Sequence, residues 1–127
     1  MAYVIEHVGL KAKDPERLAE WYQKVFGFEI VSRNDRNPPT IFVGGPEGCL
    51  MEIMPKPADS ELLSPLQKQE AHLAIKVDDF PKAIADLRAH AIDVGDVEYR
   101  PGVLNMVFFG DPEDNWLQVV YRPTPLR

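Results

Sequence analysis

The chain has 127 residues, of which 45% are hydrophobic and 27% are charged, and it carries a formal net charge of -6. This length and composition predict one compact domain and argue against a disordered chain. No run of lysine or arginine gathers anywhere, so we expect neither nucleic acid nor an anionic membrane as a partner. The lone Cys49 excludes an internal disulfide and is interpreted as a small buried hydrophobic residue. Without a basic leader or an apolar run of about 18 residues, the expected compartment is the cytoplasm.

The first half of the chain predicts a strand, a helix and three further strands. Residues 3–13 alternate and are rich in β-branched side chains, which is typical of a strand. Asp14 provides an N-cap, Pro15 suits the first helical position, and apolar residues at helical spacing predict a helix over 15–26 that Gly27 ends. Short apolar runs between turn-forming residues then predict three strands, over 28–33, 40–44 and 49–54.

The second half repeats this order after a proline-containing linker over 55–69. A strand is expected over 71–77, and Asp79 and Pro81 begin a helix that runs to about His90. The inward-facing positions of this helix are expected to be Ala83, Ile84 and Leu87. Three strands follow, over 97–100, 104–109 and 116–121. The fold class is therefore α+β, a single domain of two βαβββ modules that cover about 1–54 and 70–122.

Individual residues support the duplication. When the two halves are aligned, the matching pairs are His7 with His72, Lys11 with Lys76, and Asp14 with Asp79. When the offset between the two halves is increased by one residue, residues 50–54 align with residues 116–120. A duplicated unit explains these matches, because neither half alone could bury its sheet face.

Four polar residues lie in apolar surroundings: His7, Glu52, His72 and Gln118. Each has an ordinary explanation when taken singly, namely a hydrogen-bonded histidine, a solvent-facing glutamate or an edge-strand glutamine. A carboxylate within an apolar strand is costly unless it is paired, protonated or bound to a metal. Two imidazole nitrogens and two side-chain oxygens suit Zn, Ni, Co, Mn or Fe, so together the four predict a divalent metal site.

Strand alternation places a small residue and a lysine on the same face as each histidine. The residues that share these faces are Gly9 and Lys11 with His7, and Ala74 and Lys76 with His72. A small neighbour leaves room beside an imidazole. The two lysines are candidates to bind an anionic group of a substrate, and three arginines are equal alternatives: Arg33, Arg36 and Arg100.

Several stretches resemble the vicinal oxygen chelate superfamily, which includes glyoxalase I, extradiol dioxygenases, fosfomycin and bleomycin resistance proteins and methylmalonyl-CoA epimerase. The stretches that carry the resemblance lie at 7–14, 21–28, 71–79 and 109–118. The resemblance implies an open, cup-shaped mixed β-sheet around a metal, with ligands from the first and fourth strand of each module. Carried over by residue, these ligands are His7, Glu52, His72 and Gln118. Many members of the superfamily are homodimers.

The resemblance also implies a metalloenzyme. The leading hypothesis is a glyoxalase-like lyase or isomerase that moves a proton in a small oxo- or hydroxy-carbonyl substrate through a metal-stabilised enediolate. Gln118 stands where glyoxalases and dioxygenases usually carry glutamate, and since glutamine cannot accept a proton, Glu52 is the expected base. With the modules exchanged, the ligand set resembles that of methylmalonyl-CoA epimerase. Lys11 stands where bacterial glyoxalases tend to carry an arginine for glutathione, which argues against glutathione.

Two alternatives stay open at this point. A non-haem Fe(II) dioxygenase would use His7, His72 and Glu52 as a two-histidine, one-carboxylate site. A metal-free binding protein, like the bleomycin resistance proteins, would sequester a small ligand and need none of these residues as metal ligands.

Overall fold

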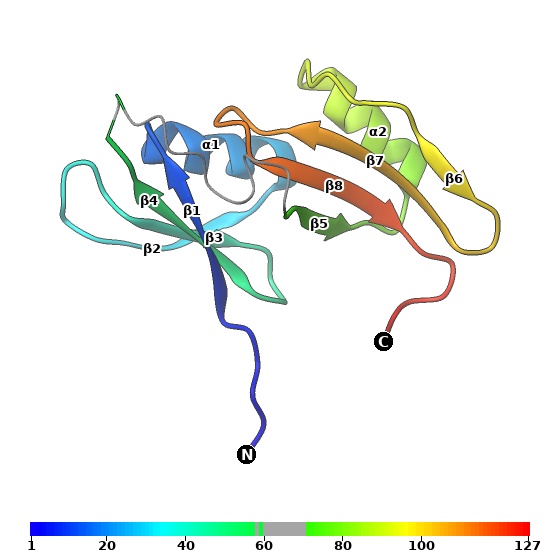
Figure 1. Ribbon diagram of the computed structural model, residues 1–127, viewed down its shortest axis with the longest axis horizontal. Helices are drawn as coiled ribbons and strands as arrows, with labels where there is room; N and C mark the ends of the chain where they lie inside the picture. The colour runs from blue at the N-terminus through cyan, green and yellow to red at the C-terminus, as the bar shows by residue number, and fades with distance from the viewer. Residues whose placement is uncertain (58, 60–70) are drawn as a thin grey trace. The chain divides into compact units, whose positions relative to one another are not determined.

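The computed structural model describes residues 1–57, 59 and 71–127, so most of the expected linker lies outside the described residues. The chain divides into two compact units, Met1–Ser64 and Pro65–Arg127. Each unit is one βαβββ module with a four-stranded mixed sheet and one helix (Figure 1). The predicted α+β architecture of two such modules is confirmed.

The first module has five elements: β1 (His7–Ala12), α1 (Pro15–Phe26), β2 (Glu29–Arg33), β3 (Ile41–Gly44) and β4 (Leu50–Pro55). The strand order in its sheet is β1-β4-β3-β2. β1 and β4 run parallel, whereas the β4–β3 and β3–β2 pairs are antiparallel. This topology makes the first and last strands of the module direct neighbours.

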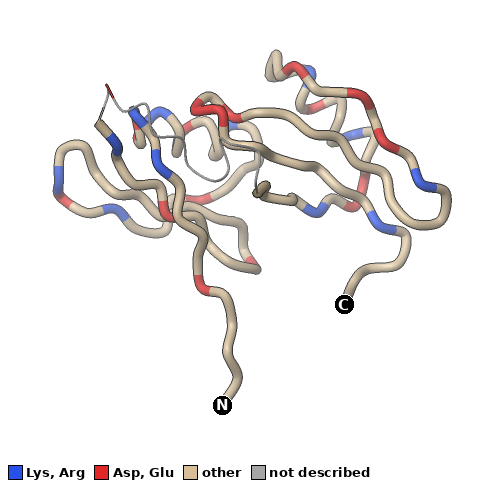
Figure 2. Tube along the Cα trace, in the orientation of Figure 1, with Lys and Arg blue, Asp and Glu red and all other residues tan. Residues whose placement is uncertain are grey.

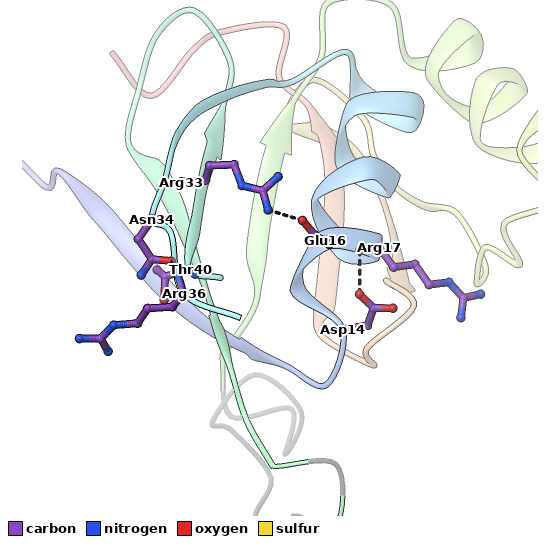
Figure 3. Close-up of polar contacts among 7 residues, drawn as sticks. All are labelled: Asp14, Glu16, Arg17, Arg33, Asn34, Arg36 and Thr40. Atoms are coloured by element: carbon purple, nitrogen blue, oxygen red, sulfur yellow. Dashed lines mark hydrogen bonds and ion pairs between the residues drawn. The ribbon is translucent and has the colours of Figure 1, made fainter. Parts of the chain in front are cut away.

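Helix α1 has the boundaries that the sequence predicts. The Asp14 carboxylate accepts a hydrogen bond from the backbone N–H of Arg17 at 3.1 Å (Figure 3). Gly27 ends the helix in the left-handed conformation with φ 67°. The helix contacts all four strands and covers one face of the sheet. The core between them consists of apolar side chains and the aromatic ring of Tyr22. Its almost completely buried members are Leu10, Ala12, Leu18, Ala19, Tyr22, Ile41, Val43 and Ile53.

The second module repeats the plan with β5 (Leu73–Lys76), α2 (Phe80–Ala89), β6 (Glu98–Arg100), β7 (Leu104–Gly110) and β8 (Trp116–Tyr121). Its strand order, β5-β8-β7-β6, is that of the first sheet, and β5 is parallel to β8. The Asp79 carboxylate caps α2 by accepting from the Lys82 N–H at 3.0 Å. Its core is formed by Phe80, Ile84, Leu87, Val107, Phe109, Leu117 and Val119.

Three local predictions were wrong. The first strand begins at His7. The residues before it, including Tyr3, are exposed and do not belong to a strand. β5 begins at Leu73, so His72 directly precedes its strand. Cys49 is exposed because β4 begins only at Leu50, which leaves the thiol in the turn before the strand.

Acidic and basic residues are both spread along the trace (Figure 2). In the described part of the chain, no helix combines the length and the apolar character that crossing a bilayer demands.

Candidate metal centre

The first module brings His7 and Glu52 together on the sheet face opposite α1. Parallel pairing of β1 with β4 sets Gly9 beside Glu52, and His7 lies two residues earlier on the same face. The Nε2 atom of His7 lies 3.7 Å from Oε1 of Glu52. Both side chains are partly accessible, at 36% and 23%. The pair is therefore open to a ligand from solvent and held by backbone register.

A second carboxylate fixes the orientation of the His7 ring. Nδ1 of His7 lies 2.9 Å from Oε1 of Glu6, so the Nδ1–H donates to that carboxylate. The lone pair of Nε2 then faces the Glu52 carboxylate. Both groups are hydrogen-bond acceptors, so they repel one another unless a proton or a cation lies between them. Two donors about 2.1 Å from one cation are separated by roughly 3.0–3.4 Å. The observed separation needs a shift of only a few tenths of an ångström, so the pair fits a divalent cation.

Gly9 leaves space beside Glu52 that the end of the Met54 side chain largely occupies. A Cβ atom at Gly9 would lie 2.8 Å from Cε of Met54 and 3.9 Å from Oε1 of Glu52. The end of the Met54 side chain thus fills most of the room that the small residue leaves, and the Glu52 carboxylate borders it.

The second module has the same strand register as the first, but the amide of Gln118 takes the place of the Glu52 carboxylate. Gln118 lies opposite Ala74, as Glu52 lies opposite Gly9, and only 8% of Gln118 is exposed. Its Nε2–H donates to Sδ of Met106 at 2.8 Å. Among the described residues, its carbonyl oxygen makes no hydrogen bond, so it remains available to a cation.

A tight turn fixes the start of β8, which carries Gln118. The buried Asp111 carboxylate accepts from the backbone N–H groups of Glu113 at 2.8 Å and Asn115 at 3.0 Å. It also accepts from Nδ2 of Asn115 at 2.8 Å. Local hydrogen bonds from a side-chain carboxylate to the backbone make a turn rigid, so β8 begins from a defined position.

An aromatic contact that sequence reasoning missed accompanies each histidine. His7 meets Phe42 edge-to-face at 5.4 Å between ring centroids, and His72 meets Phe108 in the same way at 5.2 Å. Phe42 lies opposite Glu52 in the sheet, and Phe108 lies opposite Gln118. The shift in numbering that aligns Glu52 with Gln118 also aligns the two phenylalanines, so the repeat contained the signal for them.

The described modules each hold two of the four expected ligands. His7 and Glu52 belong to the first, and His72 and Gln118 to the second. Within residues 1–57, 59 and 71–127, no group of three or more His, Cys, Asp and Glu side chains is arranged around one point. The meeting of all four ligands at one cation stays a prediction.

The basic candidates differ in whether a carboxylate already holds them. Arg33 pairs with Glu16 on α1 (Figure 3). Arg100 pairs with Glu98 at 2.7 Å. The Arg36 side chain extends away from the polar contacts drawn in Figure 3. In the part of the chain that the structure describes, Lys11 and Lys76 form no ion pair. Lys11, Lys76 and Arg36 are therefore better placed than Arg33 and Arg100 to meet a substrate anion.

Known proteins with the same fold cover nearly the whole chain. The structure is similar to glyoxalase I from Leishmania major, described as trypanothione-dependent, with a TM-score of 0.74, 21% identity and coverage of 94% of this chain and 87% of that one. It is similar to lactoylglutathione lyase from Agrobacterium tumefaciens, with a TM-score of 0.72, 18% identity and 94% coverage of both chains.

A third similar structure is a mutant of the fosfomycin resistance protein FosX from Listeria monocytogenes, complexed with Mn(II) and dihydroxypropylphosphonic acid. Its TM-score is 0.74 at 16% identity, over 99% of this chain and 94% of that one. The TM-scores of 0.72–0.74 establish a shared fold, and at identities of 16–21% the similarity shows the fold alone. A comparison of the sequence with curated proteins gives no significant match. The family model of the Glyoxalase/Bleomycin resistance protein/Dioxygenase superfamily matches residues 4–119, and the chain belongs to this superfamily.

Proposed function

We propose that this protein is a metal-dependent lyase or isomerase of the glyoxalase type that moves a proton within a small oxo- or hydroxy-carbonyl substrate. The observation that carries the proposal is the His7–Glu52 pair, with Nε2 and Oε1 3.7 Å apart and Nδ1 of the histidine held by Glu6. A buried or half-buried carboxylate next to an oriented imidazole is an arrangement that metal sites require and that a packed core does not.

The residues that would hold the cation are His7 and Glu52 from one module and His72 and Gln118 from the other. Their two nitrogens and two oxygens suit Zn, Ni, Co, Mn or Fe. When bound, the cation would act as a Lewis acid that stabilises negative charge on substrate oxygen. The edge contacts of Phe42 and Phe108 would keep both imidazole rings in place.

Glu52 would transfer the proton. It is the one member of the ligand set that can accept a proton from carbon and return it to the neighbouring carbon, because the Gln118 amide has no basic oxygen of comparable strength. Its side chain remains 23% exposed, so a substrate can reach it. Gln118 would bind without exchanging protons.

The test is solvent-proton exchange. A panel of small 2-oxo- and 2-hydroxy-carbonyl compounds is incubated in D2O with protein loaded with each candidate metal, and deuterium incorporation at carbon is followed by NMR. We expect incorporation for at least one compound with the natural protein, and a loss of about 10²–10⁴-fold in rate with Glu52→Gln. Glu20→Gln on α1, an exposed glutamate outside the site, is the matched control and should exchange at the natural rate.

The metal content of each protein is measured in parallel. If Glu52→Gln still binds metal and still exchanges deuterium at the natural rate, the proposal is wrong. Oxygen consumption with a catechol by the iron-loaded protein, without any deuterium exchange, would instead assign it to the dioxygenase alternative.

A further inference from the structure

The second module contains a cavity of about 340 Å³ on the sheet face opposite α2. Its floor is formed by strand residues Ala74, Lys76, Gln118 and Val120, and the segment after β8 contributes Arg122 and Arg127. Since a water molecule takes up about 30 Å³, the space suits roughly ten water-sized groups. Cavities of this size hold small organic ligands.

The side chains that line the cavity include three cations and no carboxylate. Lys76, Arg122 and Arg127 line the cavity, and among the described residues none of them forms an ion pair. Three other cations of the described residues are paired, namely Arg33 with Glu16, Lys82 with Asp86 at 3.0 Å and Arg100 with Glu98 at 2.7 Å, whereas Lys11 shares the lack of an ion pair. No aspartate or glutamate lines the cavity. In a chain of net charge -6, an unpaired basic wall marks a place where an anion is favoured.

Gln118 connects this cavity to the candidate metal centre. It is more than nine-tenths buried, its Nε2–H is directed to Met106, and its carbonyl oxygen has no hydrogen-bond partner among the described residues. Lys76 lies opposite Val120, and this pair is two residues along the strands from the pair of Ala74 and Gln118. At about 3.3 Å per residue, this spacing is roughly 7 Å. Figure 2 shows basic positions at the ends of both β5 and β8.

We propose that the cavity binds the anionic end of a small organic acid or phosphate ester, with Lys76 and Arg122 contacting its oxygens. Val120 would contact the short apolar part of the ligand, and the opposite end would reach Gln118. Only the part of this inference that concerns the reacting end of the ligand rests on the proposed function. If both proposals hold, the substrate carries a carboxylate or phosphate a few bonds from the reacting carbon. Binding of the anionic end needs no metal.

The experiment measures anion binding to the full chain by ¹H–¹⁵N NMR titration in the presence of a chelator. The probes are propanoate, inorganic phosphate and the neutral analogue propanamide. We expect either anion or both to shift the backbone signals of β5 and β8, with propanamide at least about tenfold weaker. Anion affinity should fall about tenfold in Lys76→Gln and in Arg122→Gln. Arg88→Gln on α2, which removes the same charge from the same module, should bind as the natural chain does.

The outcomes separate the two proposals. Anion binding that survives in Glu52→Gln and without metal supports the cavity even if no proton exchange is found. Phosphate binding without propanoate binding identifies a phosphate ester, and the reverse identifies an organic acid. Equal affinity for propanamide, or equal losses in Arg88→Gln and Lys76→Gln, would overturn the cavity as an anion site whatever the metal chemistry.

Discussion

His7 contacts two carboxylates that would have different functions. Glu52 lies toward Nε2 and would be a ligand and a base, whereas Glu6 accepts from Nδ1 and would set the ring orientation. The second module lacks the orienting acid, because Ala71 precedes His72. The two histidines are therefore unequal, and the first should bind the metal more strongly.

This inequality predicts the effect of Glu6→Gln. An outer carboxylate raises the basicity of a metal-bound imidazole, and its loss typically weakens metal binding by about 10–100-fold. Glu6 is largely exposed, so we expect the low end, about tenfold. The measurement is a Zn(II) titration against a chromogenic chelator. Glu29→Gln, on the exposed strand β2, is the control, and an equal affinity for Zn(II) in all three proteins would contradict the orienting role of Glu6.

At the scale of whole elements, the two modules end their helices differently. α1 ends at Gly27, with φ 67°, but the left-handed position after α2 is Ala91, with φ 57°. The N–H of Ala91 donates to the Arg88 carbonyl at 3.0 Å, as expected for this type of helix end. An alanine in the left-handed region costs about 1–2 kcal/mol, which glycine avoids.

A pair of reciprocal substitutions tests this account. Ala91→Gly should raise the free energy of unfolding by about 0.5–1 kcal/mol, because the relief of strain exceeds the entropy that glycine adds to the unfolded chain. Gly27→Ala should lower it by a similar amount. A Cβ at Gly27 would meet nothing within 4 Å, so its effect comes from the backbone alone. Urea denaturation measures both changes, and a loss of stability in Ala91→Gly would show that the strain is absent.

The same elements show what the sequence could predict. Helix α1 matches its predicted bounds because the cap, the proline and the terminal glycine are local signals. Strand starts were wrong where pairing decides them: residues 1–6 have strand-like composition, yet β1 pairs with β4 only from His7 onward. Repetition selected His7, Glu52, His72 and Gln118 as expected ligands, and their binding of a metal stays a prediction. Repetition did not reveal Glu6, which resembles any exposed acid, nor Phe42 and Phe108, whose contacts depend on sheet register.

Over the whole molecule, neither module can complete a metal site by itself. Each offers one histidine and one side-chain oxygen, whereas a bound divalent cation takes four to six ligands. The chain nevertheless builds each module around its own helix and its own core, so each can position its pair independently. A shared site would then make metal binding a property of two modules together.

This sharing predicts the stoichiometry. We expect one divalent ion per chain, and the loss of that same ion in both His7→Ala and His72→Ala, because each substitution removes a ligand from the common site. Metal analysis after gel filtration measures the ratio. Two ions per chain, with one retained in each variant, would mean that the modules bind metal separately.

A mixture of the His7→Ala and His72→Ala chains tests whether each metal site is formed within one chain or between two chains. The site could combine the two modules of one chain, or, in a homodimer, the first module of one chain with the second module of its partner, and the mixture distinguishes these arrangements. Consider the homodimer first. A mixed dimer of His7→Ala and His72→Ala then contains one site with both substitutions and one with neither, so co-refolding the two should restore metal to about half of the mixed dimers' sites. The His90→Ala chain, altered at an exposed helix end, is the control partner for each variant. If the sites lie within single chains, every site in the mixture carries one substitution and no metal binding returns.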